Sequence, residues 1–183
     1  KSKYRKYYLD DLYDLLNLIS IGEKTTNLRF DIPIDLENML KNIFKNEFSY
    51  IGYAPGAGEK DKVWDINNYI KLIHHFENKK YKSVFFLGPD DENIKKQIKK
   101  NFPDAIYPEE IIDNFSGPEI VIGSSKFLKI ALSNDSGVSH MLSTNNCHLI
   151  KLFGPKESKK FTPDSNYIST INASDFGGRD INL

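Results

Sequence analysis

From Tyr50 onward, short apolar runs alternate with segments of helical periodicity, and this alternation restricts the possible folds more than any other feature. Such alternation is typical of βαβ units, which build a parallel sheet covered by helices. The expected strands are Tyr50–Ala54, Ser83–Leu87, Ala131–Asn134, His148–Phe153 and an edge strand at Tyr167–Ile171. The expected helices are Ile66–Phe76, Glu92–Lys100, a short helix near Lys126–Ile130 that follows the apolar run Glu119–Ile122, and a helix from Gly137. The sequence therefore predicts an α/β fold with a parallel sheet.

The first 49 residues have a different pattern. Tyr4–Ile21 carries leucine and isoleucine at the three-and-four spacing of an amphipathic helix, and Asp31–Phe48 repeats it more weakly, with Pro33 suited to a helix start. We therefore expect a helical connector at 1–49 and the sheet domain at 50–183. The chain starts at Lys1 rather than methionine and stops soon after Gly177-Gly178. We therefore expect a fragment of a two-lobed protein.

Composition excludes several classes of function. The chain has 183 residues, of which 39% are hydrophobic, so it can form the buried core of an ordinary globular domain. The 25 basic and 25 acidic residues balance, so no overall field favours nucleic acid or an anionic membrane, and any anion site must be local. Cys147 is the sole cysteine, which predicts a reducing, cytoplasmic setting. No apolar stretch approaches the roughly 18 residues of a membrane-spanning helix.

The first candidate site is the turn Ala54–Gly58 after the first strand, followed by Lys62 and Trp64. The glycines Gly56 and Gly58, with Ala57 between them, allow backbone N–H groups to approach an anion, and the next helix turns its positive end toward the same place. Lys62 would add a full positive charge. An ordinary strand-to-helix turn with solvated lysines is the alternative interpretation, since the pattern is not that of a Walker or dinucleotide loop.

The second candidate site is the segment Ser133–His140, at the carboxyl end of a strand and the start of a helix. Ligands of open α/β sheets bind at that edge. Ser136 is placed to cap the helix, the amides of Ser136, Gly137 and Val138 can hold phosphate oxygens, and Asp135 can hold sugar hydroxyls. Alternatively, Asp135 or Ser136 is only a helix cap, Gly137 is a packing residue and His140 is a histidine whose hydrogen bonds are satisfied on the helix. Convergence of two glycine-containing turns at one edge favours a binding site.

A third strand end carries Gly88-Pro89 and the acidic run Asp90–Glu92. A carboxylate at this place can accept hydrogen bonds from both ribose hydroxyls of a nucleotide. The same acidic run can equally serve only the dipole of the following helix. The spacing of histidine and cysteine does not suggest a metal site.

Together these segments resemble glycosyltransferase family 9, the ADP-heptose:lipopolysaccharide heptosyltransferases. The matching residues are Pro55–Gly58 with Lys62–Trp64, Gly88-Pro89 with Glu92, Asp135–His140, and Leu152–Pro155 with Pro163. Their order and spacing extend over about 120 residues of the chain. Asp65 departs from the pattern, because the family usually has proline after this tryptophan.

The resemblance implies the C-terminal, donor-binding lobe of a glycosyltransferase-B fold, with a Rossmann-like parallel sheet. It assigns the diphosphate to Ala57, Gly58 and Lys62, the ribose to Glu92, a phosphate to the amides of residues 136–138, and the sugar to Asp135 with His140 nearby. It implies an inverting, metal-independent transfer of a nucleotide-bound sugar, with ADP-heptose as the expected donor and no cofactor. The general base and the lipopolysaccharide or other glycan acceptor would belong to an N-terminal lobe absent here, and the protein would be cytoplasmic or peripheral to the inner membrane.

Three other interpretations remain open at this point. A non-catalytic nucleotide or phosphate-binding module needs the same glycine turns, and a sugar-nucleotide epimerase or phosphorylase of similar fold needs them too. A protein-interaction domain would use the turns only structurally. Nucleotide binding separates the last interpretation from the others, and dependence of donor turnover on a glycan acceptor separates a transferase from an epimerase.

Overall fold

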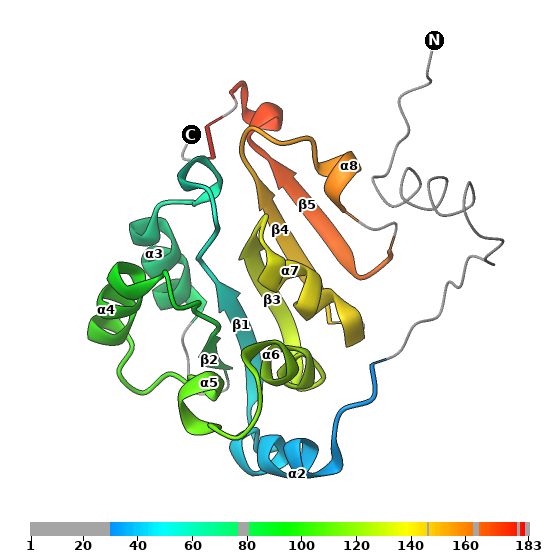
Figure 1. Cartoon of the computed structure of the whole chain (residues 1–183). Coiled ribbons are helices and arrows are strands. Elements are labelled where there is room, and N and C mark those ends of the chain that lie inside the picture. Colours follow the sequence, from blue (N-terminus) through cyan, green and yellow to red (C-terminus); the bar gives the residue numbers. More distant parts are fainter. Residues whose placement is uncertain (1–29, 77–80, 146, 163–164, 179, 182–183) are drawn as a thin grey trace, which may run out of the picture.

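A computed structural model describes residues 30–76, 81–145, 147–162, 165–178 and 180–181, so the helix predicted at Tyr4–Ile21 lies outside the described residues. The centre of the fold is a five-stranded sheet in the order β2-β1-β3-β4-β5, and all four strand pairs are parallel (Figure 1). The strands are β1 (Ser49–Ala54), β2 (Tyr81–Phe85), β3 (Leu128–Asn134), β4 (Leu149–Phe153) and β5 (Ile168–Asn172). The α/β fold with a parallel sheet is therefore confirmed.

The connections between these strands contain helices, as parallel pairing requires. The α-helices are α2 (Ile34–Ile43), α3 (Ile66–Phe76), α4 (Glu92–Asn101), α5 (Pro108–Ile111), α6 (Gly117–Ser125), α7 (Gly137–Leu142) and α8 (Ser158–Phe161). Short 3-10 helices occur at η1 (Lys60–Lys62), η2 (Ser143–Asn145) and η3 (Ala173–Phe176). No helix within the described ranges has both the length and the apolar character needed to span a bilayer.

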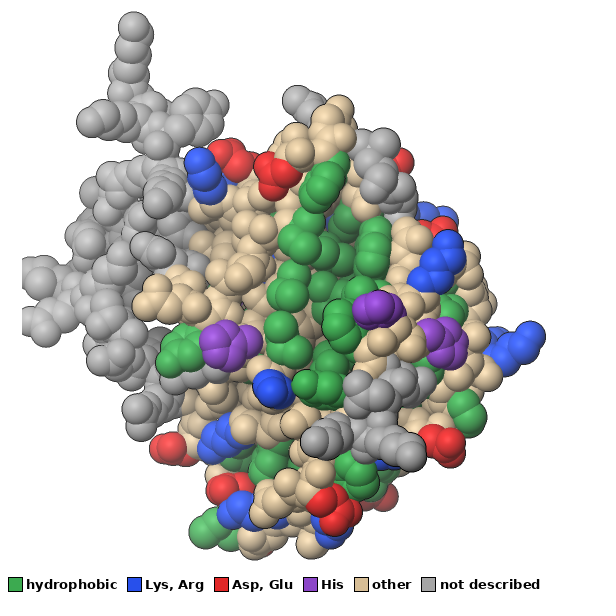
Figure 2. Space-filling model, turned by 180° about the vertical axis from the view of Figure 1, so that it is seen from behind, with side chains coloured by type: hydrophobic (Ala, Val, Ile, Leu, Met, Phe, Trp, Pro, Cys, Tyr) green, Lys and Arg blue, Asp and Glu red, His purple; other side chains and the backbone are tan. Residues whose placement is uncertain are grey.

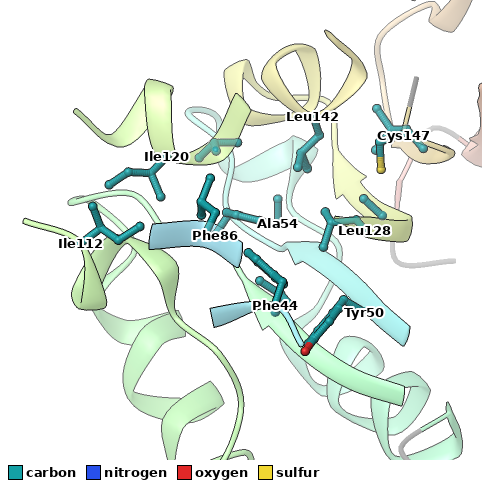
Figure 3. Packing of buried hydrophobic residues seen from close by; sticks show 14 of the residues in the cluster. Phe44, Tyr50, Ala54, Phe86, Ile112, Ile120, Leu128, Leu142 and Cys147 are labelled. Carbon is teal, nitrogen blue, oxygen red and sulfur yellow. The ribbon is translucent and has the colours of Figure 1, made fainter. Parts of the chain in front are cut away.

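One face of the sheet packs against α2, α6 and α7. Leu36 and Leu40 of α2, Ile120 of α6 and Leu142 of α7 are buried together with inward-facing strand residues. Figure 3 shows Ile120 and Leu142 in this cluster. Burying a side chain of this size contributes roughly 1.5–3 kcal/mol. The described part of the predicted connector, residues 30–49, is thus packed into the same core as the sheet, while its role as a connector stays a prediction.

The other face is covered by α3 and α4 near β1 and β2, through the buried side chains Tyr69, Ile73 and Ile98. Over β3, β4 and β5 this face carries an apolar groove of about 860 Å³, visible as a continuous band of hydrophobic side chains (Figure 2). The chain end at Ala173, Phe176 and Ile181 borders the groove.

The predicted short helix at Lys126–Ile130 is wrong. The residues before it, including the apolar run Glu119–Ile122, form α6, while Leu128 and Ile130 already pair with β1 as part of β3. The cause is a capping box at Ser116: its backbone N–H donates to Glu119 Oε2 at 2.9 Å, and its hydroxyl accepts from the Glu119 N–H. The helix therefore starts at residue 117, and its end leaves the chain free to begin the strand early.

Candidate functional site

The turn after β1 packs against the loop before α4. Gly56 is buried, and a Cβ at this position would collide with the carboxylate of Asp91. That carboxylate accepts a hydrogen bond from the Gly88 N–H at 2.9 Å. Burial raises the pKa of Asp91, partly opposed by the Gly88 N–H, and the nearby charge of Asp90 raises it further. Gly56 is thus needed for a close approach between the first and third candidate loops.

We expect Gly56→Ala to lower the free energy of unfolding by about 1–3 kcal/mol, because the added methyl group must displace a held carboxylate. Gly58→Ala is the matched control, since a Cβ there meets nothing within 4 Å and Gly58 is exposed. Urea unfolding of the two variants measures the difference. Equal stability of the two variants would contradict the assignment of a packing role to Gly56.

Asn134, the last residue of β3, joins the first and second candidate segments. Its side-chain Oδ1 accepts from the Tyr69 hydroxyl at 3.1 Å and from the Trp64 N–H at 3.3 Å, and its Nδ2 donates to the Pro55 carbonyl at 2.6 Å. The side chain is fully buried. Each such bond is costly to leave unmade in the interior, so Asn134 fixes the two turns relative to each other.

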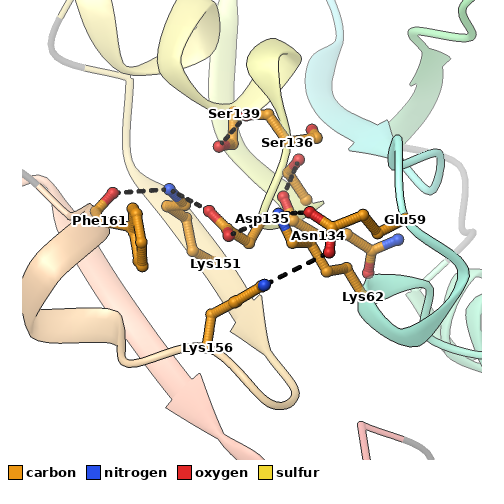
Figure 4. Close-up of polar contacts among 10 residues, drawn as sticks. Glu59, Lys62, Asn134, Asp135, Ser136, Ser139, Lys151, Lys156 and Phe161 are labelled. Carbon is orange, nitrogen blue, oxygen red and sulfur yellow. Dashed lines mark hydrogen bonds and ion pairs between the residues drawn. The ribbon is translucent and has the colours of Figure 1, made fainter.

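Beside this link lies a row of five alternating charges from Lys156 through Glu59, Lys62 and Asp135 to Lys151 (Figure 4). Lys62 Nζ lies 2.9 Å from Glu59 Oε1 and 3.6 Å from Asp135 Oδ2. Glu59 also pairs with Lys156 at 3.4 Å. Three lysines face two carboxylates, so the row carries one positive charge in excess, which suits an anionic ligand.

Asp135 is held at the inner end of the row. Its backbone N–H donates to the Leu152 carbonyl of β4 at 3.2 Å, and its Oδ1 lies 3.2 Å from Lys151 Nζ. The Lys151 side chain is 1% exposed and that of Asp135 8%. Burial lowers the pKa of Lys151, and Asp135 opposes this effect. For Lys62, burial also acts to lower the pKa, but the hydrogen bond to Glu59 and the Asp135 charge outweigh it and raise the pKa.

The predicted convergence of the first two segments is found: Lys62 and Asp135 are paired although 73 positions apart in the chain. Ala57 is partly buried in the first turn. Ser136 occupies the N-cap position of α7, but its side chain makes no capping hydrogen bond, so that detail of the prediction is wrong. Its hydroxyl oxygen is buried without a hydrogen-bond partner among the described residues, while its carbonyl accepts from the Ser139 hydroxyl at 2.6 Å.

The structure brings the residues at the start of α7 to this centre, whereas Glu92 lies apart from it. Gly137 is exposed, and a Cβ there would meet nothing within 4 Å, so the start of α7 is open, with Val138 partly buried behind it. His140 lies on the exposed side of α7; partial desolvation and then the Lys151 charge lower the pKa of its imidazole, while the Asp135 charge opposes them. Glu92 is the exposed first residue of α4 and lines a separate pocket of about 150 Å³, together with Leu87, Gly88 and Glu109.

The described part of the chain contains no group of three or more histidine, cysteine, aspartate or glutamate side chains placed to hold a metal ion.

Comparison with known proteins identifies the family of the chain. The sequence pattern of glycosyltransferase family 9 (heptosyltransferase) matches residues 11–177, which is most of the chain. The chain belongs to glycosyltransferase family 9. A family relative, lipooligosaccharide heptosyltransferase 2 of Campylobacter jejuni serotype O:2, is 22% identical over 169 residues, covering 91% of this chain and 52% of the relative. The family 9 chain thus spans about half the length of such relatives.

Solved structures of the family have the same fold. A glycosyltransferase family 9 protein from Veillonella parvula superposes with a TM-score of 0.74 at 16% identity, covering 96% of this chain and 51% of the other. The E. coli heptosyltransferase WaaC with ADP-2-deoxy-2-fluoro heptose superposes with a TM-score of 0.65 at 15% identity, covering 99% of this chain and 52% of the other. The predicted fold, a Rossmann-like lobe of the glycosyltransferase-B type, is confirmed.

Four members of the candidate site have no assigned role in the sequence analysis: Lys151, Glu59, Asn134 and Lys156. Lys151 is a charged residue in the middle of an apolar strand run, which is a signal in itself, because lysine is almost never fully buried without a partner. Glu59 follows directly after Gly58 and looks like an ordinary loop residue in the sequence. Asn134 belongs to the second segment, but nothing local reveals that it reaches the first.

Proposed function

We propose that this chain binds the nucleotide-sugar donor of a family 9 glycosyltransferase, with ADP-heptose as the donor and a lipopolysaccharide core or related glycan as the acceptor. The observation that carries the proposal is the pairing of Lys62 with Asp135 in a charge row with an excess of lysine, at the carboxyl edge of β1 and β3. Open α/β sheets bind their ligands at this edge.

The choice of donor is supported by what the related proteins bind. The superposed E. coli enzyme holds an ADP-heptose analogue, and the Campylobacter relative is named for heptosyl transfer to lipooligosaccharide. The open start of α7 and the exposed Gly58 leave space for phosphate oxygens beside Lys62.

Each predicted residue except Gly56, which packs against Asp91, contacts the donor in this proposal. Lys62, with the turn residues Ala57 and Gly58, contacts the diphosphate, and the amides of Ser136, Gly137 and Val138 bind a phosphate. Asp135 holds the sugar with His140 nearby, and Glu92 reaches the ribose from the neighbouring strand end.

The reaction follows from this placement. An acceptor hydroxyl attacks the anomeric carbon and gives its proton to a general base from the other half of the enzyme. The bond from that carbon to the diphosphate oxygen breaks with inversion, and the nucleoside diphosphate leaves with growing negative charge. Lys62 lies where that charge develops, and preorganised positive charge there lowers the barrier without a metal.

A donor-consumption assay tests the proposal on the protein that carries this chain. ADP-heptose is supplied with and without a lipopolysaccharide core acceptor, and both ADP release and the glycan product are measured. We expect ADP release that depends on the acceptor and matches the amount of glycan formed. An altered sugar nucleotide formed without acceptor would indicate an epimerase, and an unchanged donor that nevertheless binds would indicate a non-catalytic module; either result overturns the proposal.

A further inference from the structure

Lys151 lies beneath the proposed donor site, on β4 opposite Ser133 in the register of the sheet. Its ammonium group contacts Asp135 Oδ1 at 3.2 Å and donates to the Phe161 carbonyl of α8 at 3.3 Å. The Phe153 ring lies 5.0 Å from the same ammonium group. With 1% exposure, the Lys151 side chain is enclosed by the protein.

Lys62 is placed differently. Its side chain is 19% exposed, and its contact with Asp135 is the longer of its two ion pairs. A diphosphate would compete with Asp135 for the ammonium group of Lys62, so we expect Lys62 to turn away from Asp135 when the diphosphate binds. Without a second cation, that movement would leave a buried carboxylate uncompensated, which is strongly unfavourable.

We propose that Lys151 is a positioning residue: it fixes Asp135 and balances its charge, which releases Lys62 from Asp135 to bind the donor diphosphate. The inference rests on the proposed function, because it concerns the same site. Lys151 acts through Asp135 and never touches the donor. The two lysines have different roles because their positions differ. Lys151 is the buried partner of Asp135 Oδ1, and Lys62 is the partly exposed partner of Asp135 Oδ2.

The charged groups around Lys151 come from three elements: Asp135 after β3, Lys62 of η1, and His140 of α7, with the Phe161 carbonyl of α8 as the remaining partner. Because the pKa of Lys151 is lowered and that of Lys62 is raised, rising pH removes the charge of Lys151 first. Affinity for a diphosphate should therefore fall at a pH below the titration of Lys62.

The test is calorimetric titration of the whole chain with ADP and, separately, with inorganic pyrophosphate. We expect Lys151→Met to weaken both about 10-fold, the equivalent of roughly 1.4 kcal/mol. Lys159→Met removes an exposed lysine from α8 and should stay within about two-fold of the unchanged chain. We expect the affinity of the unchanged chain to fall at alkaline pH. This fall should be absent from Lys151→Met over the same pH range.

A double-mutant cycle tests whether Lys151 acts through Asp135. The variant Asp135→Asn/Lys151→Met should bind no more weakly than Asp135→Asn alone, because the residue on which Lys151 acts has already changed. If Lys151→Met alone fails to fold, the double variant and Lys151→Arg, which keeps the charge, replace it in the binding measurements. We expect Lys151→Arg to bind more tightly than Lys151→Met.

Additive effects of the two substitutions, or unchanged affinity in Lys151→Met, would overturn the inference. If pyrophosphate binds and no nucleoside diphosphate does, the proposed donor fails while the role of Lys151 is still measured with pyrophosphate. If the unchanged chain binds neither probe, both proposals are overturned.

Discussion

Lys62→Ala, introduced into the protein that carries this chain, is expected to slow glycosyl transfer about 100-fold or more. Removing one well-placed electrostatic donor from a transition state typically costs about 2.7–4 kcal/mol. Lys62 is a partly exposed cation at the centre of the charge row, with its ammonium group between Glu59 and Asp135. Turnover should be measured at saturating donor, so that weaker binding does not hide the effect on the chemical step.

Lys60→Ala is the matched control for this experiment. Lys60 belongs to the same turn of η1 but is exposed, so its loss should change turnover less than about two-fold. Near-normal turnover of Lys62→Ala, or an equal loss in both variants, would remove Lys62 from the reaction and leave it a structural member of the charge row.

Asp135→Asn is expected to lower the free energy of unfolding by about 3 kcal/mol or more, because it leaves a buried lysine without its counter-charge. The Lys151 side chain is 1% exposed, so water cannot replace the lost carboxylate in the native structure. Urea unfolding at neutral pH measures the loss.

Two further variants decide the cause of that loss. Asp61→Asn changes an exposed carboxylate of η1 and should stay within about 0.5 kcal/mol of the unchanged chain. Asp135→Asn/Lys151→Met replaces the buried charges with neutral groups and should recover most of the loss. If the double variant is less stable than Asp135→Asn alone, the buried ion pair is not the origin of the effect.

The sequence was a good guide where one period dominated a whole segment. Helix α3 begins at the predicted residue, Ile66, and its described residues extend to Phe76, because its apolar face is regular. The prediction failed between Glu119 and Ile130, where an apolar run of strand-like composition is a helix. A local capping box and the pairing of Leu128 with β1 decide the structure there, and only the first of these is visible in the sequence.

The part of the candidate site that follows from the sheet topology could be predicted from the sequence. Parallel strands bring their carboxyl ends to one edge, so Lys62 after β1 and Asp135 after β3 were expected to converge, and they are paired. The partners that hold them were not predictable. Lys151 lies between Ile150 and Leu152 in an apolar strand, and what it faces depends on the register of β3 and β4. The reach of Asn134 to Pro55 depends in the same way on how the two turns pack.

The central claim, that this chain is a donor-binding lobe, is tested most directly by calorimetric titration with ADP, UDP and GDP beside Lys62→Ala. We expect saturable binding of ADP in preference to the other two, weakened about 10-fold or more by Lys62→Ala, which is the loss of a charge-assisted contact to phosphate. Binding of none of the three nucleotides, or ADP binding that Lys62→Ala leaves unchanged, would contradict the claim.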